Sequence, residues 1–166
     1  MTVPFTIRKT NIDDQAARFE TTQVTWRDAY QDIFAEEEMI GVWSGAIPHH
    51  HPADDLREEF VGGYVAIADD TLVGHILLAM LKSGSGEIAA FYVRPSYQSN
   101  GIGRALWDEG LNDLRGRGCQ FADVWVLNRG PAVSFYEKMG CVKFGEEVFS
   151  LGDHKEPISG YRLTLR

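Results

Sequence analysis

The stretch VRPSYQSNGIGRAL, residues 93–106, sets two glycines, Gly101 and Gly103, between an apolar run typical of a β-strand and a run typical of an α-helix. Glycine adopts positive φ at little cost and lets another group come close to the backbone. The first amides of a helix lack partners inside the helix and therefore point outward. A strand that enters a helix in this way, with Gln98 three residues ahead of the first glycine, predicts a loop whose backbone amides are directed at a ligand.

The remaining sequence divides into strand-like and helix-like segments separated by turn residues. Apolar and β-branched runs predict strands, and apolar residues at three- and four-residue steps predict helices. The expected strands cover residues 5–10, 63–70, 71–81, 87–93, 121–127, 141–151 and 158–166. The expected helices cover residues 12–33, with a break into two pieces, 35–46, 54–61, 102–116 and 131–140. This order predicts one α/β (α+β) domain over residues 1–166, with a mixed, mostly antiparallel central sheet flanked by helices.

Three connections carry distinctive turn residues. Asp69 and Asp70 stand at the junction of the second and third strands, which predicts a hairpin. Pro48 and Pro52 bracket three histidines, and we expect the prolines to exclude regular structure from this segment. The residues GDHKEP, 152–157, are expected to join the last two strands as a loop.

Composition narrows the class of partner. Hydrophobic residues make up 44% and charged residues 24% of the chain, and the formal net charge is −8, as in many soluble domains. The basic residues are scattered, which argues against nucleic acid as a partner, whereas a cationic substrate is compatible with the acidic balance. No apolar run approaches the roughly 20 residues of a membrane span. The N-terminus lacks a secretion signal, and Cys119 and Cys141 form no CxxC pair, so we expect a cytoplasmic protein with reduced thiols.

Two known phosphate-binding motifs do not fit the glycine loop. A P-loop needs Lys and then Ser or Thr after the second glycine, where Arg104 and Ala105 stand. A dinucleotide fingerprint needs Gly or Ala in place of Leu106 and a first glycine directly after its strand. Asp123 is an acidic residue at about the right spacing but in mid-strand, so a dinucleotide-dependent enzyme stays an alternative. A loop that enters a helix N-terminus suits a pyrophosphate without any lysine.

The loop and its surroundings resemble the GNAT superfamily of acetyl-coenzyme A dependent N-acetyltransferases. The family signature is Gln or Arg, two residues, Gly, one residue, and Gly or Ala, and Gln98, Gly101 and Gly103 match it. The next expected elements are also present: the strand FADVWVL, then Asn128, then the helical run PAVSFYEKMG. The resemblance is specific over about residues 60–146 and general in the N-terminal helices, where this family binds its acceptors. It implies a single GNAT-type domain.

Cofactor-binding residues follow from the resemblance. It implies that backbone amides of the loop hold the pyrophosphate of acetyl-coenzyme A, the cosubstrate, and that no metal is needed. The backbone of Phe91 and Val93 is expected to run beside the pantetheine arm, and Asn128 is expected to bind near that arm. The loop residues assigned in this way are Gln98, Ser99, Asn100, Gly101, Ile102, Gly103 and Arg104.

The reaction needs a base, because an amine with a pKa of about 10.4 is mostly protonated at pH 7 and only its neutral form attacks a thioester. The resemblance places Glu87 where some relatives draw a carboxylate base; a solvated strand start is the alternative. The amide of Phe91 is expected to hold the oxyanion. Tyr136 matches the tyrosine that protonates the departing thiolate in many relatives, with a core aromatic as its alternative role.

Other conspicuous residues have simpler interpretations. Trp26 and Tyr30, four residues apart on the first helix, are expected to wall an acceptor pocket or to pack in the core. The adjacent histidines 49–51 cannot all face one metal from a regular element, so we expect a loop there. His75 stands in mid-strand and is expected to be a polar residue whose hydrogen bonds are satisfied.

The sequence therefore predicts an N-acetyltransferase that transfers acetyl from acetyl-coenzyme A to a primary amine by direct attack in a ternary complex. The acceptor, a small molecule or a peptide, stays open, with a lean to a small cationic amine. The alternative is a coenzyme A binding module without catalysis, which is a sensor or regulatory subunit. The resemblance to the GNAT superfamily also implies a homodimer.

Overall fold

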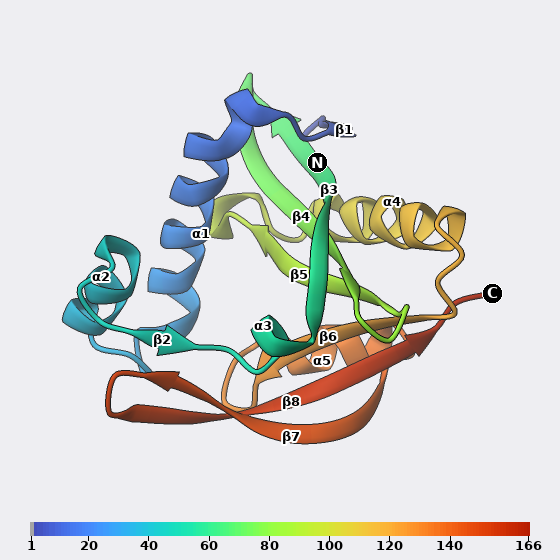
Figure 1. Cartoon of the computed structure of the whole chain (residues 1–166). Helices are drawn as coiled ribbons and strands as arrows, with labels where there is room; N and C mark the ends of the chain where they lie inside the picture. Colours follow the sequence, from blue (N-terminus) through green and yellow to red (C-terminus); the bar gives the residue numbers. More distant parts are fainter. Residues whose placement is uncertain (1) are drawn as a thin grey trace.

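The computed structural model describes residues 2–166, which form one eight-stranded sheet with helices on both faces (Figure 1). The strands lie in the order β1-β3-β4-β5-β6-β8-β7-β2. They are β1 (Thr6–Lys9), β2 (His49–His50), β3 (Arg57–Ala68), β4 (Thr71–Leu81), β5 (Gly86–Val93), β6 (Phe121–Leu127), β7 (Val142–Leu151) and β8 (His154–Thr164). The helices are α1 (Gln15–Tyr30), α2 (Glu36–Ser44), α3 (Ala53–Leu56), α4 (Ile102–Gly116) and α5 (Val133–Lys138), with short 3-10 turns at η1 (Ile12–Asp14) and η2 (Pro95–Tyr97).

The centre of the sheet opens between β5 and β6. These two strands run parallel, whereas the other neighbouring strands are antiparallel. Their pairing covers only Gly86 opposite Ala122 and Glu87 opposite Asp123, after which the strands diverge. β5 also carries a bulge at Ala89, because its neighbours on either side keep regular partners on β4. The divergence and the bulge leave strand backbone unpaired in the middle of the domain.

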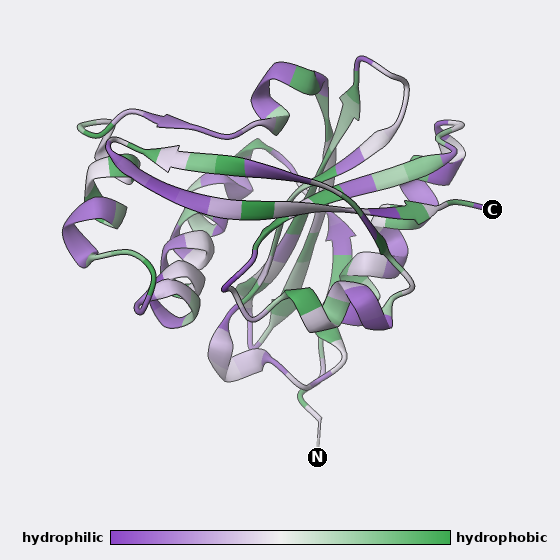
Figure 2. Ribbon diagram, turned by 90° about the horizontal axis from the view of Figure 1, so that it is seen from below, coloured by the Kyte–Doolittle hydropathy of each residue, from purple (hydrophilic) through white to green (hydrophobic). Residues whose placement is uncertain are grey.

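Helices α4 and α5 cover one face of the sheet and form the larger core. The buried side of α4 carries Ile102, Leu106, Leu111 and Leu114, at the helical steps that the sequence predicts. These residues pack with buried residues of β4, β5 and β6, and Figure 2 shows hydrophobic residues along the central strands. This packing fixes the N-terminus of α4 beside the gap between β5 and β6.

A second core holds α1 and α2 against the opposite face. Its buried members come from the connection between α1 and α2, from α2, from β6 and from the hairpin of β7 and β8: Phe34, Met39, Leu127, Phe149, Leu151 and Ile158. Trp26, Tyr30 and Trp43 pack against this cluster. The C-terminal hairpin therefore supports the helices that close the gap from this face.

Two expected features of the segment after α2 are wrong. The helix expected over residues 54–61 ends at Leu56, because the backbone from Arg57 onward pairs with β4 and this tertiary pairing overrides local preference. The prolines at 48 and 52 do not exclude regular structure either, since His49 and His50 form β2 and pair with the end of β7.

Two further boundaries differ near the C-terminus. The loop expected over residues 152–157 shortens to Gly152 and Asp153, because β8 begins at His154 and pairs with Leu151. Gly152 has a φ of 55°, which a tight two-residue turn requires. Helix α5 begins at Val133, two residues after the expected start.

The predicted hairpin between β3 and β4 is confirmed. Asp69 and Asp70 both have positive φ, 50° and 56°, as in the two-residue turns that join antiparallel strands. The single-domain, mixed and mostly antiparallel sheet is also confirmed. In the part of the chain that the structure describes, no helix combines the length and the apolar character needed to cross a membrane.

Candidate active site

A cavity of about 830 Å³, the main cavity, passes between the diverging strands β5 and β6. Its lining includes Thr22, Trp26 and Tyr92 from the α1 face of the sheet, and Gly103 and Tyr136 from the face that α4 and α5 cover. The cavity therefore reaches both faces of the sheet. Its shape leaves room for two ligands to enter from opposite faces and to meet inside it.

The glycine loop forms one wall of this cavity, which we call the loop wall. Helix α4 begins after Gly101, whose φ of 84° favours glycine, and no side chain caps the first turn. Ser99 also has positive φ, at 65°, so the backbone turns twice before the helix. The amides of the first helical turn have no partner inside the helix. The loop wall is made of Phe91, Val93, Gln98, Ser99, Gly101, Gly103 and Arg104.

Gly103 has no conformational reason to be glycine. It lies in the first turn of α4 without positive φ. A Cβ built there meets Phe91 at 3.8 Å and Val93 at 3.9 Å, which are ordinary contact distances. The missing side chain therefore leaves space on the cavity side of the helix N-terminus, where partial positive charge favours an anion.

Strand β5 directs two free amides into the gap. The Arg94 N–H donates to Val73 O on β4, at 2.8 Å. Successive residues of a strand direct their N–H groups to opposite sides, so Tyr92 also faces β4 whereas Phe91 and Val93 face the gap. β6 has already diverged at this level. The Phe91 amide thus lies where the sequence predicts an oxyanion donor.

Tyr136 lies in the middle of the cavity wall, on α5. It is buried, and burial raises its pKa, with a further contribution from Tyr92. The hydroxyl therefore stays protonated at neutral pH, and it serves as a hydrogen-bond donor rather than as a base. The ring also packs on Trp107, at 5.8 Å between centroids, so Tyr136 combines its cavity position with a role in the core.

Aromatic side chains form the opposite wall, which we call the aromatic wall. Trp26 is its centre: its ring lies 5.2 Å from Tyr30 and 6.4 Å from both Trp43 and Phe149, between centroids. The Trp26 Nε1–H donates to Tyr92 Oη at 3.0 Å, which fixes the indole. The wall is made of Trp26, Tyr30, Trp43, Trp125 and Phe149. Trp26 and Tyr30 therefore both line the cavity and pack in the second core.

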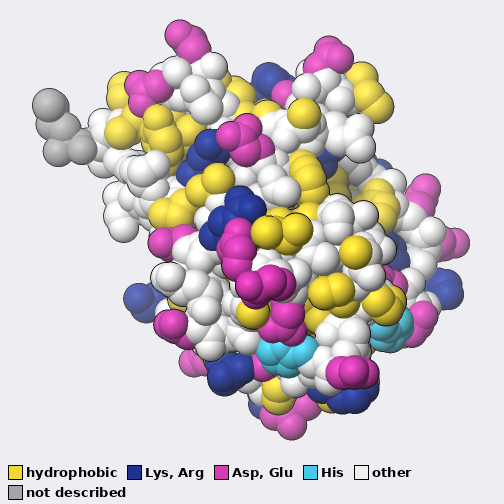
Figure 3. Space-filling model, turned by 90° about the vertical axis from the view of Figure 1, so that its left-hand side faces the viewer, with side chains coloured by type: hydrophobic (Ala, Val, Ile, Leu, Met, Phe, Trp, Pro, Cys, Tyr) yellow, Lys and Arg dark blue, Asp and Glu magenta, His cyan; other side chains and the backbone are white. Residues whose placement is uncertain are grey.

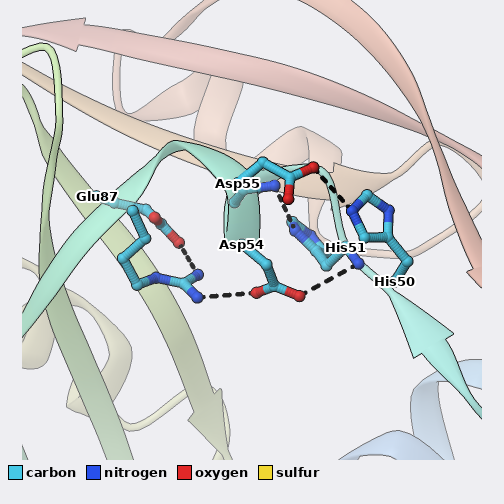
Figure 4. A network of polar contacts seen from close by, with 7 residues as sticks. His50, His51, Asp54, Asp55 and Glu87 are labelled. Carbon is cyan, nitrogen blue, oxygen red and sulfur yellow. Dashed lines mark hydrogen bonds and ion pairs between the residues drawn. The ribbon is translucent and has the colours of Figure 1, made fainter.

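An ionic network borders the aromatic wall (Figure 4). Arg57, which lines the cavity, donates to Asp54 at 2.8 Å and to Glu87 at 2.6 Å. Burial raises the pKa of Asp54, but the bonds from Arg57 and from the His51 N–H outweigh it and lower the pKa below its usual value. Burial raises the pKa of Glu87, and the Arg57 contact opposes this only in part.

His51 of the same network is a neutral hydrogen-bond donor. Burial lowers its pKa to about 4, so the ring is uncharged at neutral pH. Its Nδ1 accepts from the Ala53 N–H at 3.1 Å, which places the proton on Nε2. His51 lines the cavity, as does His49. Within residues 2–166, no three His, Cys, Asp or Glu side chains gather as a metal site does.

Glu87 does not lie directly on the cavity, contrary to the solvated or cavity-facing positions that the sequence suggests. It is 2% exposed and stands behind Arg57. Glu87 is buried because it lies where β5 is paired on both sides, opposite Ala79 of β4 and Asp123 of β6, before the bulge and the gap begin. Its Oε2 is buried without a partner among the described residues.

Three other predicted site residues also lie outside the lining. The Asn100 side chain accepts from the Val3 N–H and donates to carbonyls of the loop, so it holds the loop in shape. Ile102 contributes its backbone to the first turn of α4, but its side chain belongs to the core. Asn128 directly follows β6, and its Oδ1 accepts from Ser159 Oγ.

Sequence reasoning missed most of the aromatic wall and the network beside it. Trp43, Trp125 and Phe149 come from α2, β6 and β7. His51, Asp54 and Arg57 come from a segment expected to be a loop and a helix. The sequence offers no signal that brings these segments together, because their proximity arises only when the sheet forms.

Comparison with known proteins identifies the family. The family model described as the acetyltransferase (GNAT) family matches residues 17–141. The chain belongs to the GNAT family of acetyltransferases. The match covers most of α1, the gap between β5 and β6, the loop wall and α5. The cavity described above therefore lies in the matched part of the chain, except for the contributions of β7 and β8, such as Phe149.

Among relatives of this GNAT protein, the spermidine N(1)-acetyltransferase of Thermoplasma acidophilum is 28% identical over 81% of this chain and 86% of that protein. The mycothiol acetyltransferase of Saccharopolyspora erythraea is 31% identical over 57% of this chain but only 34% of its own length. Among solved structures, the PaiA N-acetyltransferase of Thermoplasma acidophilum in complex with coenzyme A has a TM-score of 0.66 at 22% identity, over 97% of this chain and 99% of that one. The fold expected from the loop motif is therefore confirmed.

Proposed function

We propose that this protein transfers an acetyl group from acetyl-coenzyme A to a small primary amine, by direct attack within a ternary complex. The observation that carries the proposal is the main cavity, which passes through the sheet between β5 and β6. Its loop wall offers backbone amides to one ligand, and its aromatic wall receives a second ligand from the opposite face. Direct transfer requires both ligands to meet in this way.

The loop wall fits the pyrophosphate and pantetheine arm of acetyl-coenzyme A. Uncapped amides at the N-terminus of α4 suit an anion, and the absent side chain of Gly103 leaves room for it. The free N–H groups of Phe91 and Val93 suit an arm that runs beside β5 as an added strand does. Asn128 and Asn100 are positioning residues in this scheme, because their side chains brace the neighbouring backbone. The cosubstrate supplies the thioester from which acetyl leaves.

Each chemical role falls to a residue of this chain. In the transfer, a bond forms between the amine nitrogen and the acetyl carbon, and the carbon–sulfur bond breaks. The Phe91 N–H donates to the carbonyl oxygen as negative charge develops there. Tyr136 donates a proton toward the departing sulfur. Glu87, whose Oε2 has no partner among residues 2–166 and whose pKa burial raises, receives the amine proton through water.

The acceptor we propose is a small cationic amine. Asp54 and Glu87 set two carboxyl groups against the single guanidinium of Arg57, while His51 is neutral. The electron-rich ring of Trp26 in the aromatic wall favours a cation further, whereas Arg27 already lies over the Trp43 ring, 4.8 Å from its centroid. The relative from Thermoplasma acidophilum that carries the name spermidine N(1)-acetyltransferase supports an acceptor of this class.

The test is calorimetric titration with acetyl-coenzyme A, followed by a free-thiol assay on the same sample across primary amines, peptides and aminoglycosides. We expect tight binding and thiol release with small amines that carry positive charge. Binding without thiol release from any acceptor would favour the non-catalytic coenzyme A module instead. Absence of binding would overturn the assignment of the loop wall.

A further inference from the structure

A second cavity, which we call the side cavity, lies on the α1 face of the sheet. It measures about 630 Å³ and is lined by the first half of α1 and by His75, Leu77 and Ala90 of β4 and β5. Thr22, Leu77 and Ala90 line both cavities. The side cavity therefore adjoins the main cavity on the face where the aromatic wall receives its ligand. Figure 3 shows this face, where hydrophobic side chains alternate with charged ones.

Two polar atoms of residues that line the side cavity lack hydrogen-bond partners among the described residues. They are Arg18 Nε and His75 Nδ1, and both atoms are buried. His75 itself is 3% exposed. We expected the hydrogen bonds of His75 to be satisfied. This holds for Nε2, which has a partner, but not for Nδ1, which has none among the described residues. Buried polar atoms without partners are uncommon, and each one calls for an explanation.

The hydrogen bonds around Thr22 fix which nitrogen of His75 carries the proton. The Thr22 hydroxyl donates its single hydrogen to Arg18 O, at 3.1 Å. With that hydrogen used, we assign Nε2–H as the donor across the 3.1 Å contact between His75 Nε2 and Thr22 Oγ1. Burial and the charge of Arg18 lower the pKa of His75 to about 4, which keeps the ring neutral. Nδ1 is therefore a free acceptor, while Arg18 Nε–H is a free donor.

We propose that the side cavity is a subsite for the distal end of the acceptor and that it selects a neutral hydroxyl or carboxamide group. Such a group accepts a hydrogen bond from Arg18 Nε–H and donates one to His75 Nδ1. The proposal rests on the proposed function, because the subsite extends the acceptor side of the same cavity. It names a specificity determinant of this chain that lies outside the loop wall and the aromatic wall.

The charges around the subsite argue against ionic groups. Arg18 attracts a carboxylate, but Asp13 and the lone pair of His75 Nδ1 both oppose it. Asp13 attracts an ammonium group, but the positive charge of Arg18 opposes it, and an ammonium group cannot accept from Arg18 Nε–H. A methyl group leaves both polar atoms buried and unpaired, which is costly. A hydroxyl or a carboxamide satisfies both atoms without placing a charge there.

The experiment compares primary amines of equal length that end in methyl, hydroxyl, carboxamide, carboxylate or ammonium groups, over several chain lengths. The 1-aminoalkanes, amino alcohols and amino carboxamides are the key probes, and kcat/KM is measured for each. At the best length, we expect the hydroxyl or carboxamide compound to exceed its methyl partner by about tenfold, as two net hydrogen bonds imply. Arg18→Met is expected to reduce this ratio to about twofold or less, since one of the two bonds is lost and the other weakened.

Two further variants complete the test. His75→Phe keeps the ring volume and removes Nδ1, so it is also expected to lower the ratio. Arg115→Met makes the same change on the exposed side of α4, remote from both cavities, and is expected to leave the ratio as in the native protein. An unchanged ratio in Arg18→Met, or a native preference for methyl, carboxylate or ammonium ends, would overturn the subsite.

The failure of the subsite can be told apart from the failure of the proposed function. If no amine is acetylated while acetyl-coenzyme A still binds, the same pairs of compounds are titrated calorimetrically into the protein saturated with coenzyme A. Tighter binding of the amino alcohol than of the aminoalkane, lost in Arg18→Met, supports the subsite without catalysis. Equal binding, or no binding of either compound, overturns the subsite.

Discussion

The two walls of the main cavity are built in opposite ways. The loop wall comes from one stretch, residues 91–104, and the polar groups it offers are backbone amides whose position depends on Gly101 and whose accessibility depends on Gly103. The aromatic wall comes from α1, α2, β6 and β7, and it offers side chains. One wall is therefore encoded by a local motif. The other is encoded by the packing of four elements that lie far apart in the sequence.

This difference implies a division of tasks. Backbone amides recognise a ligand that does not vary, because most loop side chains can change without moving them. Side chains of the aromatic wall and its ionic network recognise a ligand by shape and charge, so each substitution there alters the acceptor. Changes in the loop wall should therefore alter the affinity for acetyl-coenzyme A, changes in the aromatic wall should alter acceptor use, and changes where the walls meet should alter turnover.

The largest effect is expected for Glu87→Gln, behind Arg57 in the ionic network beside the aromatic wall. Glutamine retains an oxygen that accepts from Arg57, so the network keeps its shape, but it does not accept the amine proton. We expect kcat to fall about 100-fold, the low end for loss of a general base. Because burial raises the pKa of Glu87 above its usual 4.5, the native rate should decline as the pH falls through this raised value. That decline should be absent in the variant.

The control for this change is Glu147→Gln on the exposed part of β7, which should leave both the rate and the pH profile unchanged. Acetyl-coenzyme A affinity should also stay the same in Glu87→Gln. A native rate in Glu87→Gln would show that this carboxyl only positions Arg57, and the base would then have to be sought elsewhere in the ionic network.

The next effect is expected for Gly103→Val, which tests the loop wall alone. The new side chain contacts Phe91 and Val93 at ordinary distances, so the fold should tolerate it, but it fills the space beside the helix N-terminus. We expect acetyl-coenzyme A affinity, measured by calorimetry, to fall at least tenfold, about 1.4 kcal/mol. Gly116→Val is the matched control, because a Cβ there meets no atom within 4 Å. Equal affinity in the two variants would remove the pyrophosphate assignment.

A smaller effect on turnover is expected for Tyr136→Phe. A thiolate is a stable leaving group, with a conjugate acid of pKa about 8.5, so it needs less help than an alkoxide would. We expect kcat to fall about fivefold, below the usual range for acid catalysis, with the affinity for acetyl-coenzyme A unchanged. Tyr97→Phe removes a hydroxyl that contacts Asp69 at the exposed surface and serves as the control. If the two variants have the same rate, Tyr136 is a core aromatic only.

Local chemistry made most of the fold predictable from the sequence. The hairpin at Asp69 and Asp70, the helix after Gly103 and the buried strand β6 all follow from patterns within about 15 residues. The failures share one cause. The sequence predicts a helix through residues 57–61, but this segment belongs to β3 and pairs with β4, and the two histidines of β2 pair with β7, more than 90 residues away. A partner that distant leaves no trace in the local pattern.

The same limit explains which site residues were predictable. The loop residues follow a fixed spacing, so their positions in the sequence are enough to predict where they lie in the site. Glu87 follows the strand pattern, but its distance from the gap depends on where β5 and β6 separate, which only the pairing at Asp123 reveals. Strands β2 and β3 lie near opposite ends of the sheet. The segment that connects them therefore crosses beside the aromatic wall, and it carries His51, Asp54 and Arg57.

The smallest effect is expected for His154, which tests the aromatic wall without touching the loop wall. Its Nδ1 lies 2.7 Å from Glu38 Oε2 on α2, and its Nε2 lies 2.8 Å from Glu156 Oε1 on β8. Carboxylates only accept hydrogen bonds, so both nitrogens donate and the ring carries a positive charge. Bonds to Glu156 and then to Glu38 raise the pKa of His154, while Arg129 also donates to Glu156 and opposes this charge.

A raised pKa in the folded state means that His154 stabilises the fold fully at pH values below its unfolded value of about 6.5 and that this contribution disappears as the pH rises through the folded value. His154→Gln should therefore cost about 1 kcal/mol of unfolding free energy at pH 6 and much less at pH 9, as measured by urea titration. His50→Gln, which removes an exposed pair with Asp55, should cost little at either pH. Since α2 belongs to the aromatic wall alone, acetyl-coenzyme A affinity should not change. An equal cost at both pH values would mean that packing against Phe34, rather than the paired charge, holds α2 in place.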